Sequence, residues 1–335
     1  ARGIATSYSG AATNVNFNGH LDFAPDFVWI KERTGSAWHI WTDIVRGANK
    51  TIYSNDAYQQ ESLTNVMNSF DNNGFTVGYN SAYSSVFSNK NNEDYVSWNW
   101  KAGGAAVPNN DGTIPSQVSA NKDSGFSIVK YTGNATAGAK IGHGLSSAPD
   151  LIIVKLLDAT KDWYVFSELL GQSGGEYQFL ELNDSPAANT FNIQQVWNGV
   201  LPTSDVFTLT GGSADNSNNN DYIAYCFHSV ALYSKIGTYE GNGTTATTTI
   251  TTGFKPSWVM IKRTDSTNNW VIYDDKRDTT SPLSERLFAD TSGVESDGGT
   301  TSSITISPTG FSMTTSQFGG SINTDGGQYL YMAFA

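Results

Sequence analysis

Charged residues are scarce in this chain of 335 residues, at 15% of the total, and basic residues are the scarcer kind. There are 19 Lys and Arg against 31 Asp and Glu, which gives a formal net charge of −12. A surface that binds nucleic acid or anionic lipid needs clustered Lys and Arg to replace counterions. No basic run occurs, so we expect neither nucleic acid nor an anionic membrane as a partner.

Cysteine and long apolar runs are also nearly absent. Cys226 is the only cysteine, which excludes an intrachain disulfide and a cysteine-ligated zinc site. The longest aliphatic run is LIIV at 151–154, whereas a membrane-spanning helix needs about 20 apolar residues. We therefore expect no membrane insertion and no disulfide framework.

Glycine and aromatic residues are abundant, with 33 glycines and 13% aromatics. Apolar and polar residues alternate in FSIVKY (126–131) and SITISP (303–308), as in strands with one buried face. Polar turns rich in Gly, Asn and Ser separate such stretches, and no stretch has a convincing capped helical period. This pattern predicts an all-β protein.

One sequence pattern occurs three times along the chain. PDFVWIKERTGSAWHIWTD (25–43) recurs as PDLIIVKLLDATKDWYVFSE (149–168) and PSWVMIKRTDSTNNWVIYDD (256–275). Each copy then has a Phe in a turn-and-strand stretch and ends on an aromatic strand; these strands are YVSWNW (95–100), YIAYCF (222–227) and YLYMAF (329–334). Such repetition indicates tandem structural units.

The spacing within the copies separates framework from loops. Pro to the shared Trp is 13, 14 and 14 residues, while Trp to the later Phe is 37, 44 and 41, for Trp38, Trp163 and Trp270. Near-constant intervals are typical of strands and hairpins, and variable ones of surface loops. The repeated Trp residues are therefore predicted to be core residues.

The pattern predicts three tandem antiparallel β-sandwich modules of a jelly-roll-like kind. The modules are expected at 1–104, 119–228 and 229–335, with a Gly- and Pro-rich linker at 105–118. Because only 12 residues separate Phe227 from Tyr239 but 31 separate Trp100 from Tyr131, modules two and three should dock rigidly. Module one should be attached more loosely.

Two charged positions recur in every copy. They are Lys31, Lys155 and Lys262, and the acidic residues Asp43, Glu168 and Asp275 five residues after each Trp. On facing strands of a hairpin they would form cross-strand ion pairs. Recurrence in all copies favours a role in the fold over a single active site.

The sequence contains no recognisable catalytic or metal-binding motif. No Glu-x-Asp-x-x-Glu or Glu-x-Asp-x-Glu pattern is present to supply the carboxylate pair of a glycosidase, and no Gly-x-Ser-x-Gly motif is present. The turn histidine His143 is expected to bond to a backbone carbonyl. The Asn- and Asp-rich loop at 215–221 is interpreted as a turn, with calcium binding as the alternative. We expect no catalytic residue, resident metal or cofactor.

Aromatic residues in the variable intervals are the candidate binding residues. Tyr79, Tyr83 and Phe87 lie in one polar stretch of the first copy, and Trp197 lies in the second. Aromatic rings on loops stack on sugars or anchor protein partners. The alternative is that these rings pack at the module ends.

Four stretches of the second copy resemble a family. They are YTGN (131–134), GHGLSSAPDLIIVK (142–155), WNGVLPTSDVF (197–207) and DYIAYCF (221–227). Together they resemble a repeat domain of unknown function in virion proteins of marine tailed phages of the cyanophage and pelagiphage type. The resemblance spans all three copies, although the first lacks the WNGVLPTS element and the third lacks GHGL.

The resemblance implies a location on the virion surface, in a tail, fibre or capsid-surface position. Because the sequence has no catalytic motif, we expect a non-enzymatic protein that is assembled in the host cytoplasm. Its partners would be other virion proteins and a glycan or protein of the host cell surface, with the chain present as a homo-oligomer or in many copies. A purely structural decoration or assembly protein is the alternative. An enzyme that degrades polysaccharide is a third hypothesis, which the missing carboxylate pair disfavours.

Overall fold

The computed structural model describes residues 6–11, 15–16, 21–190, 196–243, 247–299, 302–313 and 322–335. The protein is all-β, with 41% of residues in strands and 2% in helices, as the sequence predicts. The two helices are short 3-10 turns, η1 (Glu168–Leu170) and η2 (Val196–Gly199). Among the described residues, no helix is long and apolar enough to cross a membrane.

Three large antiparallel sheets dominate the fold, one in each of residues 1–104, 105–228 and 229–335, here called segments 1, 2 and 3. The first sheet orders its strands as β1 (Thr6–Ser9), β9 (Asp94–Trp100), β3 (Phe27–Glu32) and β4 (Ile40–Asp43). The second is β10 (Val107–Asn109), β11 (Ser116–Asn121), β12 (Phe126–Thr132), β20 (Asp221–Phe227), β14 (Leu151–Leu156), β15 (Tyr164–Phe166) and β18 (Phe179–Glu181). The third is β21 (Ser234–Glu240), β29 (Gln328–Phe334), β23 (Trp258–Arg263), β24 (Val271–Asp274), β25 (Glu285–Phe288) and β26 (Ser296–Asp297).

Each segment also has a small sheet. Segment 1 contains β2 (Val15–Asn16), β8 (Gly74–Val77) and β7 (Met67–Asp71), segment 2 contains β13 (Lys140–Gly142) and β19 (Val206–Thr208), and segment 3 contains β22 (Thr248–Thr251), β28 (Gly310–Met313) and β27 (Ile304–Ser307). Two further ribbons pair β5 (Lys50–Thr51) with β6 (Glu61–Ser62), and β16 (Gln172–Ser173) with β17 (Glu176–Tyr177).

The same strand order and register occur in all three large sheets. The strand that ends each segment lies between the opening strand and the strand that follows the repeated Pro, as in β1-β9-β3-β4, β12-β20-β14-β15 and β21-β29-β23-β24. In each sheet, the first residue of the strand that follows the repeated Pro pairs with the last aromatic residue of the closing strand. The pairs are Phe27 with Trp100, Leu151 with Phe227 and Trp258 with Phe334. These pairs define equivalent positions among the segments.

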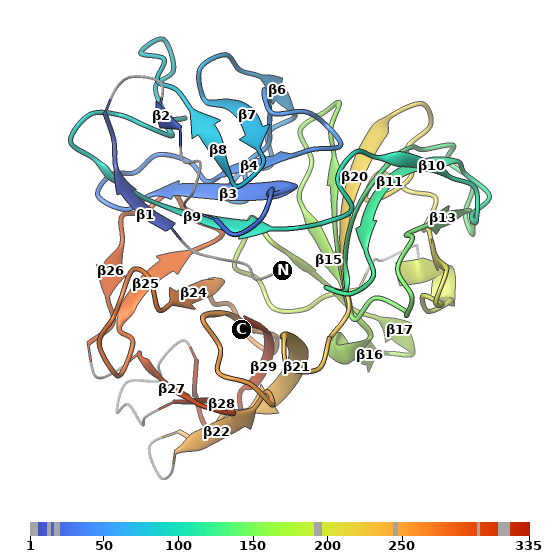
Figure 1. The fold of residues 1–335 in the computed structure, drawn as a ribbon. Coiled ribbons are helices and arrows are strands. Elements are labelled where there is room, and N and C mark those ends of the chain that lie inside the picture. Colours follow the sequence, from blue (N-terminus) through green and yellow to red (C-terminus); the bar gives the residue numbers. More distant parts are fainter. Residues whose placement is uncertain are drawn as a thin grey trace.

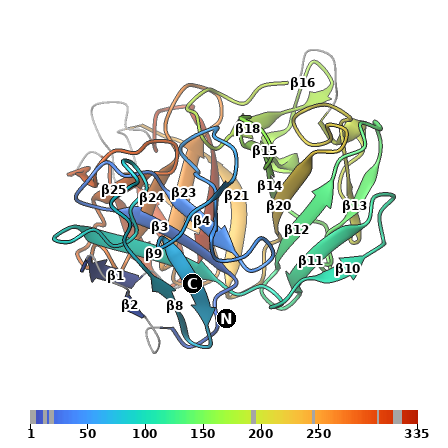
Figure 2. The same cartoon turned by 90° about the horizontal axis from the view of Figure 1, so that it is seen from above.

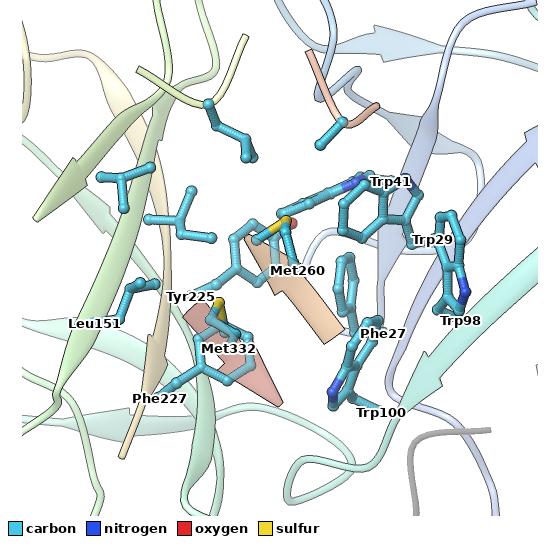
Figure 3. Packing of buried hydrophobic residues seen from close by; sticks show 14 of the residues in the cluster. Phe27, Trp29, Trp41, Trp98, Trp100, Leu151, Tyr225, Phe227, Met260 and Met332 are labelled. Atoms are coloured by element: carbon cyan, nitrogen blue, oxygen red, sulfur yellow. The ribbon is translucent and has the colours of Figure 1, made fainter. Parts of the chain in front are cut away.

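Both faces of the central strands of each large sheet are buried, because one core lies between the three sheets and a separate core lies between each large sheet and its small sheet. All six residues of β3 and of β14 are buried, as expected for continuous apolar strands. The shared cluster includes Phe27, Trp29, Trp41, Tyr225 and Met260 from different segments. Figure 3 shows these side chains converging, and Figure 1 shows the three coloured parts of the chain around a common centre.

Segment 1 is not loosely attached, so that prediction is wrong. Its Trp98 indole donates a hydrogen bond of 3.0 Å to the Asp274 carboxylate of segment 3. The Trp29 ring lies 6.4 Å from the Trp258 ring, between centroids. Loop length does not control docking here, because large apolar faces on all three sheets must be covered.

The stretch 105–118, expected as a linker, contains strand structure. β10 and the start of β11 fall within it, and β11 pairs with β12 to extend the second large sheet. Figure 2 shows β11 and β10 continuing this sheet outward from β12.

The repeated tryptophan is displaced by one residue in segment 1. The backbone N–H groups of Trp163 and Trp270 each donate to a carboxyl or amide oxygen, of Asn183 and Asp290. In segment 1 the matching bond runs from His39 to Asn55. His39 is therefore the equivalent residue, and the prediction that Trp38 is a core residue is wrong.

Candidate functional site

Trp197 lies in the core of segment 2 and not on its surface. Its side chain is 2% exposed, and its ring lies 4.9 Å from Phe166 and 6.3 Å from Phe207, between centroids. Trp197, Asn198 and Gly199 all have positive φ, at 59°, 49° and 73°. This left-handed turn directs the indole inward. The prediction that Trp197 is an accessible binding residue is therefore wrong.

The other predicted residues lie together on segment 1. Tyr79, Tyr83 and Phe87 are half-buried in the loop between β8 and β9. Tyr79 and Phe87 stack with ring centroids 5.9 Å apart and planes inclined by 28°. The Lys90 ammonium lies 5.6 Å from the Phe87 ring centroid, within the range of a cation–π contact. The Tyr83 hydroxyl accepts a 3.2 Å hydrogen bond from the Thr64 N–H.

Two further surface aromatics of segment 1 were not predicted. Trp38 is half-buried, with its ring centroid 6.5 Å from that of Tyr58, and Tyr58 is 41% exposed. The positions equivalent to Trp38 are Asp162 and Asn269, because each precedes the residue that matches His39. The fold therefore accepts a polar residue there. The interval of 13 residues, against 14 in the other copies, was the signal in the sequence.

The three segments close a ring of backbone hydrogen bonds. Gln60 of segment 1 donates to Leu157 of segment 2, Ala188 of segment 2 donates to Thr264 of segment 3, and Glu295 of segment 3 donates to Arg33 of segment 1. The three N–O distances are 2.9, 2.7 and 2.8 Å. Each segment thus contacts its two neighbours through two different parts of its surface. The third contact returns to the first segment, as in a cyclic assembly.

A recess lies beside two of these contacts. The recess between segments 3 and 1, cleft 3/1, has a volume of about 380 Å³ and is lined by Arg33, Thr34, Asp94, Glu285, Val294 and Glu295. The recess between segments 2 and 3, cleft 2/3, has the same volume of about 380 Å³. Its walls include Leu169, Leu170, Gln178, Ala187, Ala188, Thr238, Thr264, Asp265, Gln328 and Tyr329.

A domain family matches residues 4–335, which is nearly the whole chain; it is described as a domain of unknown function, DUF7483. The chain belongs to the DUF7483 family. No curated protein matches it.

The recurring lysines of the DUF7483 chain bind backbone carbonyls and not the recurring acids, so the predicted cross-strand ion pairs are wrong. Lys155 Nζ donates to the carbonyls of Ala57, Leu156 and Lys161 at 3.0, 2.9 and 2.8 Å. Ala57 belongs to segment 1, so this lysine also links two segments. Burial lowers the pKa of Lys155 to about 7.

In two segments of the DUF7483 fold, the second strand of the hairpin ends in an aspartate that forms a buried ion pair with an arginine. Asp43 binds Arg46 and accepts a 2.7 Å hydrogen bond from Tyr225 of segment 2. Asp274 binds Arg277 and accepts the Trp98 hydrogen bond. Register shows that the equivalents of Asp43 are Asp274 and Ser167, not Asp275 and Glu168.

Turn chemistry accounts for the histidine and the Asn- and Asp-rich loop. Leu145 N–H donates to His143 Nδ1 at 3.2 Å, so His143 Nε2 carries the proton and donates to the Thr203 carbonyl at 3.1 Å. This confirms the expected role of His143. Asn216 accepts from the Asn134 N–H and donates to the Thr136 carbonyl. Within the described ranges, no group of three His, Cys, Asp or Glu side chains is placed to hold a metal ion.

Proposed function

We propose that this DUF7483 protein is a non-enzymatic component of a virion surface, in a tail, fibre or capsid-surface position, that contributes to attachment to a host glycan or protein. The resemblance to virion proteins of marine tailed phages supports the location. The observation that carries the attachment role is the surface aromatic group of segment 1, formed by Trp38, Tyr58, Tyr79, Tyr83 and Phe87.

The comparison among segments argues that the fold does not require an indole at the position of Trp38 in every copy, although in segment 1 the Trp38 ring packs on the buried Tyr53 ring, with centroids 4.9 Å apart. Trp38 corresponds to Asp162 and Asn269, so packing alone does not demand an indole. Tyr58 keeps 41% of its surface exposed. Rigid rings at such positions provide contact area at low entropic cost. A single weak contact of this kind becomes effective when many copies engage one cell.

We propose further that the segments are three tandem β-sandwich modules of a jelly-roll-like kind, at 1–104, 119–228 and 229–335. The recurring strand order and the small sheet facing each large sheet support this. Residues 105–118 would then belong to the second module, since β10 and β11 continue its sheet.

The alternative is a purely structural decoration or assembly protein. The burial of Trp197 favours it, because one of the predicted binding residues is a core residue. The buried carboxylates of Asp43 and Asp274 are bound by arginine, which makes them parts of the framework and supports a non-enzymatic role.

The test is particle adsorption to host cells with Trp38→Asn and Tyr83→Ala variants. Asn occupies the equivalent position in segment 3, so Trp38→Asn should fold, with a lower melting temperature because the packing of Trp38 on Tyr53 is lost. Attachment predicts slower adsorption for both variants. Asn269→Ala, at the equivalent position of segment 3, is the matched control and should adsorb normally. Normal adsorption of both aromatic variants, with the fold intact, would support the decoration role instead.

A further inference from the structure

Clefts 3/1 and 2/3 are built from equivalent positions but differ in charge. The register of the large sheets and the backbone bonds from Glu295 to Arg33 and from Ala188 to Thr264 align them. Four charged positions of cleft 3/1 are neutral in cleft 2/3; the pairs are Arg33 and Thr264, Glu295 and Ala188, Asp94 and Gln328, and Glu285 and Gln178.

In cleft 3/1 the charged side chains bind one another across the segment boundary. Arg33 Nε and Nη2 lie 2.6 and 2.8 Å from the two oxygens of Glu295, in a bidentate pair. Arg277 Nη1 lies 3.4 Å from the same carboxylate. Arg33 and Glu295 therefore neutralise one another across the boundary.

In cleft 2/3 no such bridge forms. Thr264 and Ala188 are joined only through the backbone, and Leu170 stands at the position of Arg277. The single carboxylate among its lining residues, Asp265, is paired with Arg263 at 2.8 Å. The walls are thus electrically balanced and present small or apolar side chains on one side.

We propose that cleft 2/3 is a binding site for a neutral sugar ring, free or at the end of a glycan. Gln178 Nε2 donates to the Ala188 carbonyl, and Gln328 Nε2 donates to the Glu240 carboxylate and the Gly326 carbonyl. The carboxamide oxygens of both residues and the Thr238 hydroxyl would therefore accept hydrogen bonds from the ligand, which suits a molecule with many hydroxyls and no charge. Leu169 and Leu170 offer an apolar wall to the C–H face of the ring. The volume of about 380 Å³ is within the range of small-molecule sites.

This inference does not rest on the proposed attachment function, because the cleft lies between segments 2 and 3 whereas the surface aromatics lie on segment 1. The probes are glucose, mannose, galactose and N-acetylglucosamine, with glucuronate and glucosamine as charged comparisons. Saturation-transfer NMR on the full chain should show contact with at least one neutral sugar and weaker contact with the charged ones. Absence of contact with every neutral sugar would overturn the proposal.

The decisive variant copies cleft 3/1 into cleft 2/3. Ala188→Glu with Thr264→Arg should form the bidentate pair that the molecule already accommodates elsewhere, and should weaken sugar binding about tenfold or more. The matched control, Arg33→Thr with Glu295→Ala, should bind the sugar as the parent does. If the first variant fails to fold, Gln178→Glu with Gln328→Asp replaces it. Unchanged binding in a folded cleft 2/3 variant would contradict the assignment.

Discussion

A fully buried ammonium group is the most demanding residue-scale feature of this fold. Lys31, Lys155 and Lys262 are each 0% exposed. Lys155 meets the desolvation cost with three carbonyl acceptors, one for each N–H of its ammonium. Two of its acceptors come from its own hairpin and the third from segment 1, so the residue stabilises the fold and the contact between segments together.

Because the pKa values of these lysines are lowered, we expect the free energy of unfolding to rise with pH above about pH 7. Burial lowers the pKa of Lys155 to about 7 and those of Lys31 and Lys262 to about 8, whereas an unfolded lysine titrates near 10.4. Between these values the unfolded chain binds more protons, so the free energy of unfolding increases with pH. Urea unfolding from about pH 7.5 to about pH 9.5 should show this rise.

In the Lys155→Met variant, the free energy of unfolding should rise less steeply with pH than in the parent. In the control variant Lys235→Met, at an exposed position, the rise should be the same as in the parent. The pKa values of Asp215 and Asp290 are raised to about 7 by burial, and their opposite effect on stability falls below this window. Above about pH 10 the buried tyrosines also oppose the rise, because the pKa of Tyr225 is raised by burial. A flat profile for the parent chain would contradict the prediction.

At the scale of elements, the end of the second hairpin strand is stabilised in two different ways among the three segments. In segments 1 and 3 the second strand ends in a buried Asp–Arg pair. In segment 2 the same positions hold Ser167 and Leu170, and Ser167 Oγ accepts the Leu169 N–H as the Asp274 carboxylate accepts the Lys276 N–H. Ser and Leu thus keep the cap while replacing the charges with apolar contact.

The difference between segments 2 and 3 at these two positions can be tested with a double variant. Arg277→Leu alone should lower the free energy of unfolding by about 3–5 kcal/mol, because the Asp274 charge is left buried and unpaired. Arg277→Leu with Asp274→Ser should cost less than the single change, since it copies segment 2. The neighbouring pair Asp275→Ser with Lys276→Leu serves as control and should cost less than about 1 kcal/mol. Urea unfolding with constant m-values measures all three; a double variant less stable than the single would refute the explanation.

At the scale of the whole molecule, the three sheets share one core and cannot be stabilised separately. Large rings from all segments meet there; for example, Phe27 lies 5.0 Å from Tyr225, and Trp100 lies 5.7 Å from Phe334, between ring centroids. The ring of backbone bonds among the segments adds a second set of contacts. Removing one segment would expose an apolar face on each of the other two.

Calorimetry should therefore show one cooperative transition for the full chain, with equal calorimetric and van't Hoff enthalpies. Trp258→Ala, in the shared core of segment 3, should cost about 3–5 kcal/mol and move the entire transition to lower temperature. Phe311→Ala, in the separate core of segment 3, should also move the whole transition. Two or three resolved transitions would show that the segments unfold independently.

Local sequence pattern was enough to predict the strands and turns. Alternation and turn residues act over a few positions, so the all-β class and the recurring strands could be recognised from pattern. Three of the five aromatic residues of the candidate site were also accessible this way, because Tyr79, Tyr83 and Phe87 fall in an interval that varies among the copies. The equivalence of His39, and not Trp38, to Trp163 and Trp270 was indicated by the spacing from the repeated Pro, which is one residue shorter in the first copy.

The contacts between sheet faces could not be predicted from local pattern, because they depend on packing among distant parts of the chain. The acceptor from segment 1 that Lys155 binds, the hydrogen-bond partners of Asp43 and Asp274 on other segments, and the common core all join residues far apart in the chain. Trp197 is buried because a left-handed turn directs its ring inward. Local sequence pattern carries the preference of a strand for burial, but the surface that covers it is selected by packing among all three sheets.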